Sequence, residues 1–177
     1  AEDAVDVCGT GGDQHGTVNV STAVAFVLAG AGVKVAKHGN RAVSSRSGSS
    51  DILTELGIKM DVAANRMRKA LDEANVCFLH APIYHAAMKN VSAIRAELGF
   101  RTIFNLIGPL TNPARVRRQV IGVFDKNWCD PMARILQTLG SEHVWVVHGG
   151  DGMDEITTTT HTYAVEQARE SLRSFDI

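Results

Sequence analysis

The chain has 177 residues, of which 45% are hydrophobic and 21% charged, as in an ordinary globular protein. This length can bury one hydrophobic core but not two full-sized domains. The formal net charge of −1 argues against a protein that binds nucleic acid or an anionic membrane through its overall charge. Three cysteines without a CxxC pair disfavour a disulfide framework or a zinc knuckle and favour a reducing compartment, the cytoplasm.

The two ends of the sequence favour a piece of a longer protein without a retained signal peptide. No basic segment followed by an apolar one stands at Ala1, so we expect no retained signal peptide. The most apolar window, residues 18–36, contains Asn, Ser, Thr, Gly and Lys, which favours a buried helix and strand over a membrane span. Residues 172–177 alternate like the start of a strand. We therefore expect a piece of a longer protein.

Short apolar runs alternate with amphipathic ones along the chain. A strand is predicted at 5–8, followed by a helix at about 21–31 with Asn19 or Ser21 as its N-cap and Gly32 as its stop. The middle of the chain then predicts a strand at 33–36, helices near 51–56 and 63–73 (the second capped by Asp61), a buried strand at 76–79, and a helix over 83–98 that Gly99 ends.

The last third continues the same alternation. Strands are predicted at 119–124 and 143–147, with a helix at 131–139 between them that ends at Gly140. Strands that alternate with helices at this rhythm predict an α/β fold, a mostly parallel sheet flanked by helices with right-handed crossovers.

The first candidate site is the GTGGD loop at 9–13, between the first predicted strand and the first predicted helix. Its glycines allow positive φ angles and let N–H groups approach an anion, which a helix N-terminus also favours. The loop is not the dinucleotide fingerprint, because Gln14 occupies the third glycine position, and it is not a Walker loop. Taken alone, it is compatible with a phosphate site or with a tight turn.

The second candidate site is the loop from Lys37 to Ser50. Lys37, Arg41 and Arg46 supply positive charge, and five serines supply hydroxyl groups. The loop follows a predicted strand, and open α/β sheets bind ligands at the carboxyl ends of their strands. A flexible linker would also be rich in Ser and Gly, but the KHGNR sequence at 37–41 favours a polyanion or ribose-phosphate site.

The third candidate site is the HGGDGMDE segment at 148–155, which also follows a predicted strand. Adjacent carboxylates after a glycine turn suit Mg²⁺, which takes hard oxygen ligands and bridges to substrate phosphates. An exposed acidic turn is the alternative for this segment alone. Beside two loops suited to phosphate, a cation site is the more coherent interpretation.

Other residues carry weaker signals. The seven histidines show no zinc-ligand spacing. His80 and His85, at a strand-to-helix junction, fit a pocket lining or an ordinary helix entry equally well. Arginines at 115–118 are most simply a solvated strand entry, and Trp128 and Trp145 are most simply core residues.

Four motifs in this order resemble the anthranilate phosphoribosyltransferase family. They are GTGGD at 9–13, NVST at 19–22, KHGNR at 37–41 with the serine-rich loop to Asp51, and MDE at 153–155. The similarity covers essentially the whole chain, including HAP at 80–82 through Arg95 and NLIGPLTNP at 105–113.

The resemblance implies Mg²⁺-dependent transfer of the phosphoribosyl group from phosphoribosyl pyrophosphate to the amine of anthranilate, with release of pyrophosphate. It also implies a fold of the nucleoside phosphorylase/phosphoribosyltransferase type, a homodimer in the full-length protein, and neither a nucleic-acid nor a membrane partner. Residues 1–177 would be the central part of the larger α/β catalytic domain, truncated at both ends, without the N-terminal helical domain and the C-terminal part.

By similarity, the site residues fall into three groups. The donor, phosphoribosyl pyrophosphate, would contact Gly9, Thr10, Gly11, Gly12, Asp13, Thr17, Asn19, Ser21, Thr22, Lys37, Asn40, Ser45 and Ser49. The acceptor, anthranilate, would contact Gly9, His38, Asn40, Ala81, Pro82, His85, Arg95, Gly108 and Pro109, with Arg95 at its carboxylate. Two magnesium ions would be held by Ser21, Asp154 and Glu155. No general base is assigned, because an uncharged aromatic amine can attack before losing a proton.

The sequence departs from the family at one wall of the acceptor site, where Met88 stands at a position that is aromatic in many relatives. One alternative, a pyrimidine nucleoside phosphorylase, would require a Lys-x-Ser-x-Arg segment, which residues 37–41 do not match. Another, a nucleic-acid-binding relative of the same fold, would require a basic groove, for which 115–118 offers a local patch. We expect the 177 residues alone to be weakly active or inactive.

Overall fold

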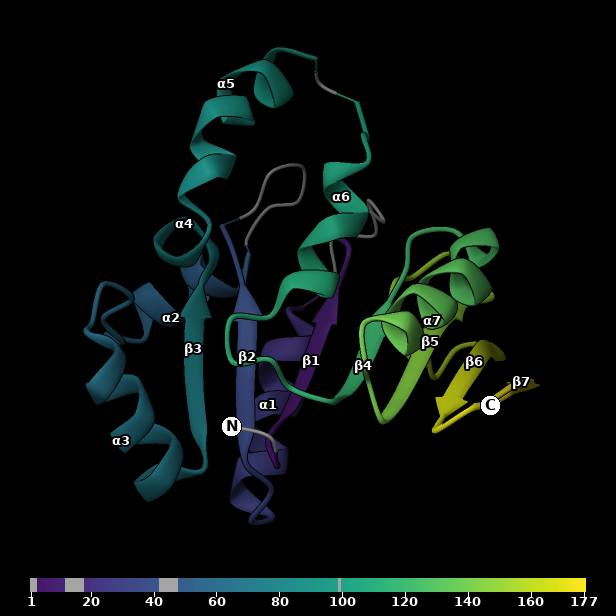
Figure 1. The fold of residues 1–177 in the computed structure, drawn as a ribbon, viewed down its shortest axis with the longest axis horizontal. Coiled ribbons are helices and arrows are strands. Elements are labelled where there is room, and N and C mark those ends of the chain that lie inside the picture. The colour runs from purple at the N-terminus through teal and green to yellow at the C-terminus, as the bar shows by residue number, and fades with distance from the viewer. Residues whose placement is uncertain (1–2, 12–17, 42–47, 99) are drawn as a thin grey trace.

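The computed structural model describes residues 3–11, 18–41, 48–98 and 100–177, which form one sheet with helices on both faces (Figure 1). The order of the seven strands in the sheet is β3-β2-β1-β4-β5-β6-β7. The strands are β1 (Val5–Gly9), β2 (Val35–Gly39), β3 (Val76–His80), β4 (Arg118–Gly122), β5 (His143–Gly149), β6 (Thr162–Ala168) and β7 (Ser171–Asp176). Strands β1 to β5 pair in parallel, whereas β6 and β7 are antiparallel additions at one edge. The predicted α/β class with a mostly parallel sheet is confirmed.

The helices connect the parallel strands and extend beyond their carboxyl ends, where α5 and α6 lie at the top of Figure 1. The α-helices are α1 (Val20–Gly30), α2 (Ser49–Glu55), α3 (Ala64–Ala74), α4 (Ala81–Tyr84), α5 (Lys89–Leu98), α6 (Phe104–Ile107) and α7 (Cys129–Thr138). Three 3₁₀ turns are η1 (Ala86–Met88), η2 (Gly108–Thr111) and η3 (Lys126–Trp128). Within the described ranges, no helix has the length and apolar character needed to cross a bilayer.

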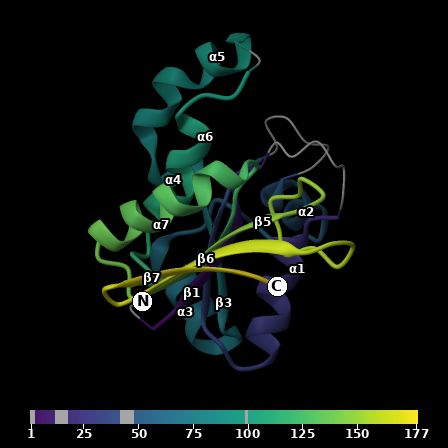
Figure 2. The same cartoon turned by 90° about the vertical axis from the view of Figure 1, so that its right-hand side faces the viewer.

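The core lies on both faces of the sheet, because successive residues of a strand point to opposite sides. On one face, Val7 of β1 packs in a cluster with Ala25 of α1 and Leu53 of α2. On the other face, Cys8 packs in a cluster with Met132 of α7. Figure 2 shows α1 and α7 on the two sides of the sheet. Strand β1 is thus covered on both faces, which explains why it reads as a short apolar run.

Most predicted boundaries of the first half are confirmed within a few residues. Helix α1 begins after Asn19, whose side chain accepts a hydrogen bond from the Thr22 backbone N–H at 3.1 Å, and Gly32 follows its end with a φ of +88°. Strand β2 begins two residues later than predicted. The predicted cap Asp61 is wrong: α3 follows Ala63, which makes no side-chain cap hydrogen bond.

The predicted continuous helix over 83–98 is wrong. The segment forms three pieces, α4, η1 and α5, and the first break is at His85, whose φ of −117° and ψ of 63° are not helical. The apolar pattern continues across the break, so periodicity alone did not reveal it. The break gives His85 a contact with the end of β2, described below.

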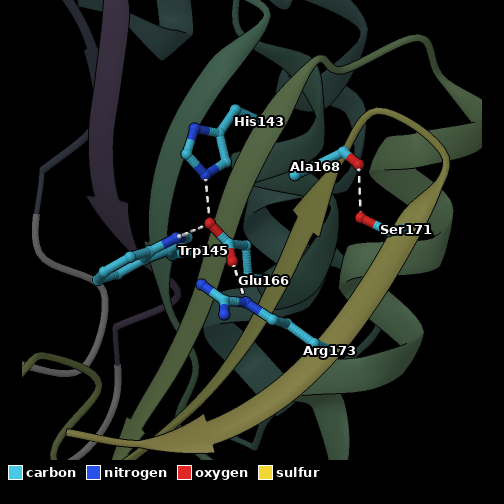
Figure 3. Close-up of polar contacts among 6 residues, drawn as sticks. All are labelled: His143, Trp145, Glu166, Ala168, Ser171 and Arg173. Atoms are coloured by element: carbon cyan, nitrogen blue, oxygen red, sulfur yellow. Dashed lines mark hydrogen bonds and ion pairs between the residues drawn. The ribbon is translucent and has the colours of Figure 1, made fainter.

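The antiparallel end of the sheet contains β6, which was not predicted, and β7, which was predicted as the start of a strand. Glu166 belongs to β6, which lies between β5 and β7, and Figure 3 shows its side chain with its polar partners. Its carboxylate accepts hydrogen bonds from His143 Nε2 at 2.6 Å, from Trp145 Nε1 at 3.0 Å and from Arg173 Nε. These donors come from β5 and β7, so the cluster ties three strands together. Trp145, expected in the core, is only half-buried.

Candidate functional site

The three candidate loops leave the sheet at one edge. In the parallel register, Gly9 of β1 lies beside Gly122 of β4, and Gly39 of β2 lies beside His80 of β3. Strand β5, which leads into the third loop, is parallel to β4 and ends at the same edge. Open α/β sheets bind their ligands in this position, outside the carboxyl ends of the strands.

Asp154 joins the first loop to the third. Its Oδ2 accepts a hydrogen bond of 2.6 Å from the Gly11 backbone N–H. A Cβ atom at Gly9 would lie 2.4 Å from Asp154 Oδ2, and one at Gly122 would lie 1.5 Å from the Asp154 backbone oxygen. Asp154 therefore sits directly on the ends of β1 and β4, which is possible only because both positions are glycine. Glu155, the next residue, is half-buried.

The described part of the first loop uses its N–H groups within the protein. The Thr10 N–H donates to the Gly122 carbonyl at 2.9 Å, and Thr10 Oγ1 accepts from the Phe124 N–H at 3.1 Å. The N–H groups of Thr10 and Gly11 thus hold loops together in this conformation, instead of pointing free toward an anion. Four predicted donor residues lie outside the described residues: Gly12, Asp13, Thr17 and Ser45.

The second loop contacts the N-terminus of α1. Thr22 Oγ1 donates to Asn19 Oδ1 at 2.5 Å and lies 3.0 Å from Ser49 Oγ, which belongs to the first turn of α2. Gly39 permits this arrangement, because a Cβ atom there would lie 3.2 Å from Ser49 Cβ. Predicted donor residues from two distant segments of the chain are thus brought together.

Lys37 extends the same cluster from β2. Its side chain is 1% exposed, and its Nζ donates to Ser21 Oγ at 3.0 Å and to the Val7 carbonyl at 2.6 Å. A buried ammonium group needs such partners, since an unpaired charge is expensive to remove from water. Asn40, by contrast, is exposed, and its Oδ1 accepts from the Arg41 N–H at 2.8 Å.

His38 points to the other side of β2, where the predicted acceptor residues gather. Its Nε2 lies 3.2 Å from His85 Nε2, and its imidazole also hydrogen bonds with the Gly108 backbone. Burial, and next to it the neighbouring His85, lowers the pKa of His38 to about 4, so this side chain is neutral near pH 7. The two histidines, which come from separate elements, thus contact each other through their Nε2 atoms. At least one of the two rings must be uncharged, because one nitrogen has to accept the hydrogen bond.

The remaining acceptor residues lie around this pair or outside what is described. Ala81 and Pro82 begin α4 and are half-buried, and the Pro109 carbonyl accepts from Gln119 Nε2 at 3.1 Å. Arg95 belongs to α5, and its side chain lies outside the described part of the structure. His80, for which the sequence left two alternatives, places its Nδ1 2.8 Å from Ser50 Oγ at the start of α2.

The oxygen ligands at this edge fit Mg²⁺ by their chemistry. Asp154 and Glu155 offer carboxylates, and Mg²⁺ is typically held by one or two carboxylates together with waters and substrate phosphates. Ser21 offers a hydroxyl at the N-terminus of α1, where Lys37 already contacts it. Across the described ranges, no group of three or more His, Cys, Asp or Glu side chains gathers as a metal cluster.

Sequence reasoning missed two polar residues beneath this edge. Asp6 is completely buried in β1, and Asn112, which follows η2, is 9% exposed. Asn112 Nδ2 donates to Asp6 Oδ2 at 2.7 Å. An acidic residue inside the apolar run Val5–Cys8 was the available signal, because a buried carboxylate requires dedicated partners.

The basic patch that a nucleic-acid-binding protein would require is partly offset by one acidic residue. Arg117 Nη1 lies 3.0 Å from Glu142 Oε1, and Arg118 Nη2 lies 2.8 Å from Glu142 Oε2. One carboxylate thus pairs with two of the arginines at 115–118, which gives no support to that alternative.

Comparisons with known proteins agree on one family. A family model described as "Glycosyl transferase family, a/b domain" matches residues 1–177. Anthranilate phosphoribosyltransferase of Phenylobacterium zucineum is 59% identical over 173 residues, which are 98% of this chain and 51% of that protein. The protein of the same name from Rhodopseudomonas palustris (strain HaA2) is 56% identical over 175 residues, 99% of this chain and 52% of its own length.

Solved structures give the same result for the fold. The crystal structure of anthranilate phosphoribosyltransferase from Thermus thermophilus has a TM-score of 0.89 at 45% identity and covers 99% of this chain and 52% of its own. The enzyme of that name from Saccharomyces cerevisiae, in complex with PRPP and Mg, has a TM-score of 0.87 at 34% identity and covers 100% and 49%. The chain therefore spans about half the length of the relatives it matches.

Proposed function

This chain belongs to the glycosyl transferase family, a/b domain, and on that premise we propose that the protein transfers a phosphoribosyl group from phosphoribosyl pyrophosphate to the amine of anthranilate. The observation that carries the proposal is the convergence of the three candidate loops. Asp154 of the third loop binds Gly11 of the first, and Lys37 and Ser49 of the second contact the N-terminus of α1. Relatives with this name cover nearly the whole chain, which supports the same choice.

The donor side of the site is the edge formed by the glycine loop, the N-terminus of α1 and the end of β2. There the Lys37 ammonium and the hydroxyls of Ser21, Thr22 and Ser49 supply positive charge and hydrogen bonds for a diphosphate. The full proposed donor set is Gly9, Thr10, Gly11, Gly12, Asp13, Thr17, Asn19, Ser21, Thr22, Lys37, Asn40, Ser45 and Ser49.

Two Mg²⁺ ions per site belong to the proposal, with Ser21, Asp154 and Glu155 as their protein ligands. Bound Mg²⁺ would neutralise negative charge on the pyrophosphate leaving group. The carboxylate of Asp154 also holds Gly11, so this residue would both fix the loop and face the ion. A neighbour of the same fold is described as a complex with PRPP and Mg, which supports this part of the proposal.

The acceptor side lies around the His38–His85 pair. A neutral His38 suits a benzoate ring, since it adds no charge beside the reacting amine. The proposed acceptor set is Gly9, His38, Asn40, Ala81, Pro82, His85, Arg95, Gly108 and Pro109, with Arg95 at the carboxylate.

The chemistry follows from these two sides. The amine nitrogen attacks ribose C1 as the bond to the pyrophosphate oxygen breaks, so positive charge develops on the sugar and negative charge on the leaving group. Lys37 and the donor hydroxyls stabilise the leaving group, and the acceptor residues orient the amine. The nitrogen loses its proton after attack, so no strong general base is required beforehand.

We place this chain as the central part of the α/β catalytic domain of a longer, cytoplasmic, homodimeric enzyme. Its coverage of about half of each relative supports this assignment. On this basis the 177 residues alone would have weak activity or none.

The direct test is an assay of the full-length enzyme with phosphoribosyl pyrophosphate, anthranilate and Mg²⁺. Formation of N-(5-phosphoribosyl)anthranilate, lost on addition of a chelator and restored by Mg²⁺, is the expected result. A pyrimidine nucleoside with inorganic phosphate serves as the control substrate pair. Turnover of that pair, and none with anthranilate, would overturn the proposal in favour of a nucleoside phosphorylase.

A second test uses the 177-residue chain itself. Titration calorimetry with phosphoribosyl pyrophosphate should give heat of binding in the presence of Mg²⁺ and little without it. Glu155→Gln is the matched variant, because it keeps the size of the side chain and removes its charge. Equal binding with and without Mg²⁺, in both proteins, would contradict the metal assignment.

A further inference from the structure

Strands β1 and β2 separate just below the candidate site. Their ladder pairing is limited to Val5 with Val35 within these two described strands, although β1 pairs with β4, and β2 with β3, over five residue pairs each. The Val5 N–H donates to the Lys34 carbonyl at 2.8 Å, as expected for this register. Continuing the register would bond the Val7 N–H to the Ala36 carbonyl and the His38 N–H to the Val7 carbonyl.

Each of these four backbone groups is instead hydrogen-bonded to a side chain. Asp6 Oδ1 accepts from the His38 N–H at 3.1 Å, and its carboxylate also accepts from the Val7 N–H. Asn112 Nδ2 donates to the Ala36 carbonyl at 2.9 Å. The Val7 carbonyl accepts from Lys37 Nζ at 2.6 Å. No backbone group lost from the ladder is left unsatisfied, so the gap is a built feature of the sheet.

The carboxylate of Asp6 is central to this arrangement. It receives the backbone N–H groups of Val7 and His38 and the side-chain amide of Asn112, and all of these are donors. An ionised carboxylate accepts without donating, so it matches this set, whereas an amide at the same position would match only part of it. Burial raises the pKa of Asp6, and Lys37 and the hydrogen bonds lower it.

Two adjacent residues of β2 next to the gap point to opposite sides of the sheet, as successive strand residues do. Lys37 turns to α1 and reaches Ser21 on the donor side, whereas His38 turns to Gly108 and His85 on the acceptor side. Both residues are also bonded into the gap, Lys37 through its ammonium and His38 through its backbone N–H.

We propose that Asp6 and Asn112 are positioning residues that bridge β1 and β2 where the ladder stops and thereby fix Lys37 and His38 at the two halves of the candidate site. An ordinary ladder would connect the two strands without a buried charge, so connection alone does not account for these residues. The inference rests on the proposed function for its kinetic consequences but not for its geometry.

The test is a variant cycle at the two residues. Asp6→Asn removes one acceptor and places an amide donor against either His38 or Asn112. Asn112→Asp alone places a second carboxylate beside Asp6. The double variant D6N/N112D exchanges donor and acceptor and restores their match, although the Ala36 carbonyl then loses its donor.

In the full-length enzyme, we expect each single variant to lower kcat/KM for both substrates by at least about 10-fold, and the double variant to recover at least about threefold relative to Asp6→Asn. Val144→Ala, which is also fully buried but lies in β5, is the stability control. It should lower the melting temperature with kcat/KM unchanged within twofold.

The geometric part is measured on the 177-residue chain by amide hydrogen exchange. The His38 amide should be protected in the wild type, exchange faster in Asp6→Asn, and regain protection in the double variant. Asn112→Ala, which leaves the Asp6–His38 hydrogen bond possible, supplies a milder variant should Asp6→Asn not fold. It should lower kcat/KM for both substrates by at least about threefold.

The outcomes separate the two proposals. An inactive full-length wild type with a protected His38 amide contradicts the proposed function and leaves the strand-bridging geometry supported. An active enzyme in which the Asp6 and Asn112 variants, like Val144→Ala, change only stability overturns the positioning role. An unprotected His38 amide in the wild type also overturns it.

Discussion

Two buried carboxylates lie in different parts of the sheet, Asp6 among the parallel strands and Glu166 among the antiparallel ones, and they join strands in different ways. Asp6 lies between the parallel strands β1 and β2, where the ladder stops and side chains replace it. Glu166 lies on β6 between β5 and β7, where the antiparallel ladders continue over seven and six residue pairs. Asp6 therefore substitutes for backbone pairing, whereas Glu166 adds side-chain bonds to pairing that is already complete.

The partners of the two carboxylates differ in the same way. Glu166 is reached by the side chains of Trp145, His143 and Arg173, and these hydrogen bonds, Trp145 first, lower its pKa to about 2. For Asp6, burial is the largest influence and raises the pKa. A carboxylate whose charge is stabilised in this way suits a structural role that links β5, β6 and β7, and we call Glu166 with its three donors the clamp. A costly charge beside the candidate site points to a functional requirement there.

The largest expected effect distinguishes the two ends by activity. Glu155→Gln in the full-length enzyme should lower Mg²⁺-dependent turnover by at least about 100-fold, because metal stabilisation of a leaving group is worth several kcal/mol. Glu166→Gln makes the same chemical change at the antiparallel end and should leave turnover within about twofold. Steady-state kinetics at saturating substrates measures both. Equal losses in the two variants would remove the functional distinction between the two ends.

The next effect concerns stability at the carboxyl ends of the parallel strands, which we call the parallel edge. Gly122→Ala should cost about 3 kcal/mol or more, because its Cβ would lie 1.5 Å from the Asp154 backbone oxygen and no rotamer can relieve a backbone clash. Gly30→Ala is the matched control, since outside the neighbouring backbone of α1 no atom lies within 4 Å of its Cβ position. Urea unfolding of the 177-residue chain gives both values. A loss below about 1 kcal/mol at Gly122 would mean that the third loop moves freely off β4.

The sequence was sufficient for the parallel part of the fold because its signals are local. The Asn19 cap, the Gly32 stop and the buried apolar strands each act within a few residues, and all were predicted near their observed places. The break at His85 and the bridge at Asp6 depend on partners far along the chain, such as His38 and Asn112. Hydrophobic periodicity cannot report such contacts.

For the candidate site, the motifs predicted which loops come together but not how. The contact between Gly11 and Asp154 spans 143 positions in sequence. The N–H groups of the glycine loop were expected to face an anion. In the described conformation, the N–H groups of Thr10 and Gly11 instead donate to the Gly122 carbonyl and to the Asp154 carboxylate. Glycine patterns indicate close approach of some group, and only the three-dimensional arrangement shows which one.

A smaller effect tests the clamp directly. Glu166→Gln should lower the free energy of unfolding by about 1 kcal/mol, because the amide oxygen can still accept from Trp145 and His143, whereas the amide nitrogen would face the Arg173 donor. The loss is modest because Arg173 is 70% exposed in its side chain and can be solvated by water. Thermal unfolding of the chain measures it. A loss comparable to that of Gly122→Ala would show that the clamp, and not the parallel edge, limits stability.

The smallest effect is the pH dependence of that same difference. Glu166 has a pKa of about 2 in the folded chain against an ordinary value of 4.5, so it binds protons less readily when folded. Its contribution to stability is therefore fully present above about pH 5 and is lost as the pH falls toward 2. The difference in unfolding free energy between wild type and Glu166→Gln should shrink as the pH falls from 4.5 to 2. Asp6 has the opposite sign, because its raised pKa makes ionisation unfavourable in the folded chain. Denaturant unfolding across this pH range, compared with Asp6→Asn, should give slopes of opposite sign for the two carboxylates, and equal signs would contradict the distinction between clamp and bridge.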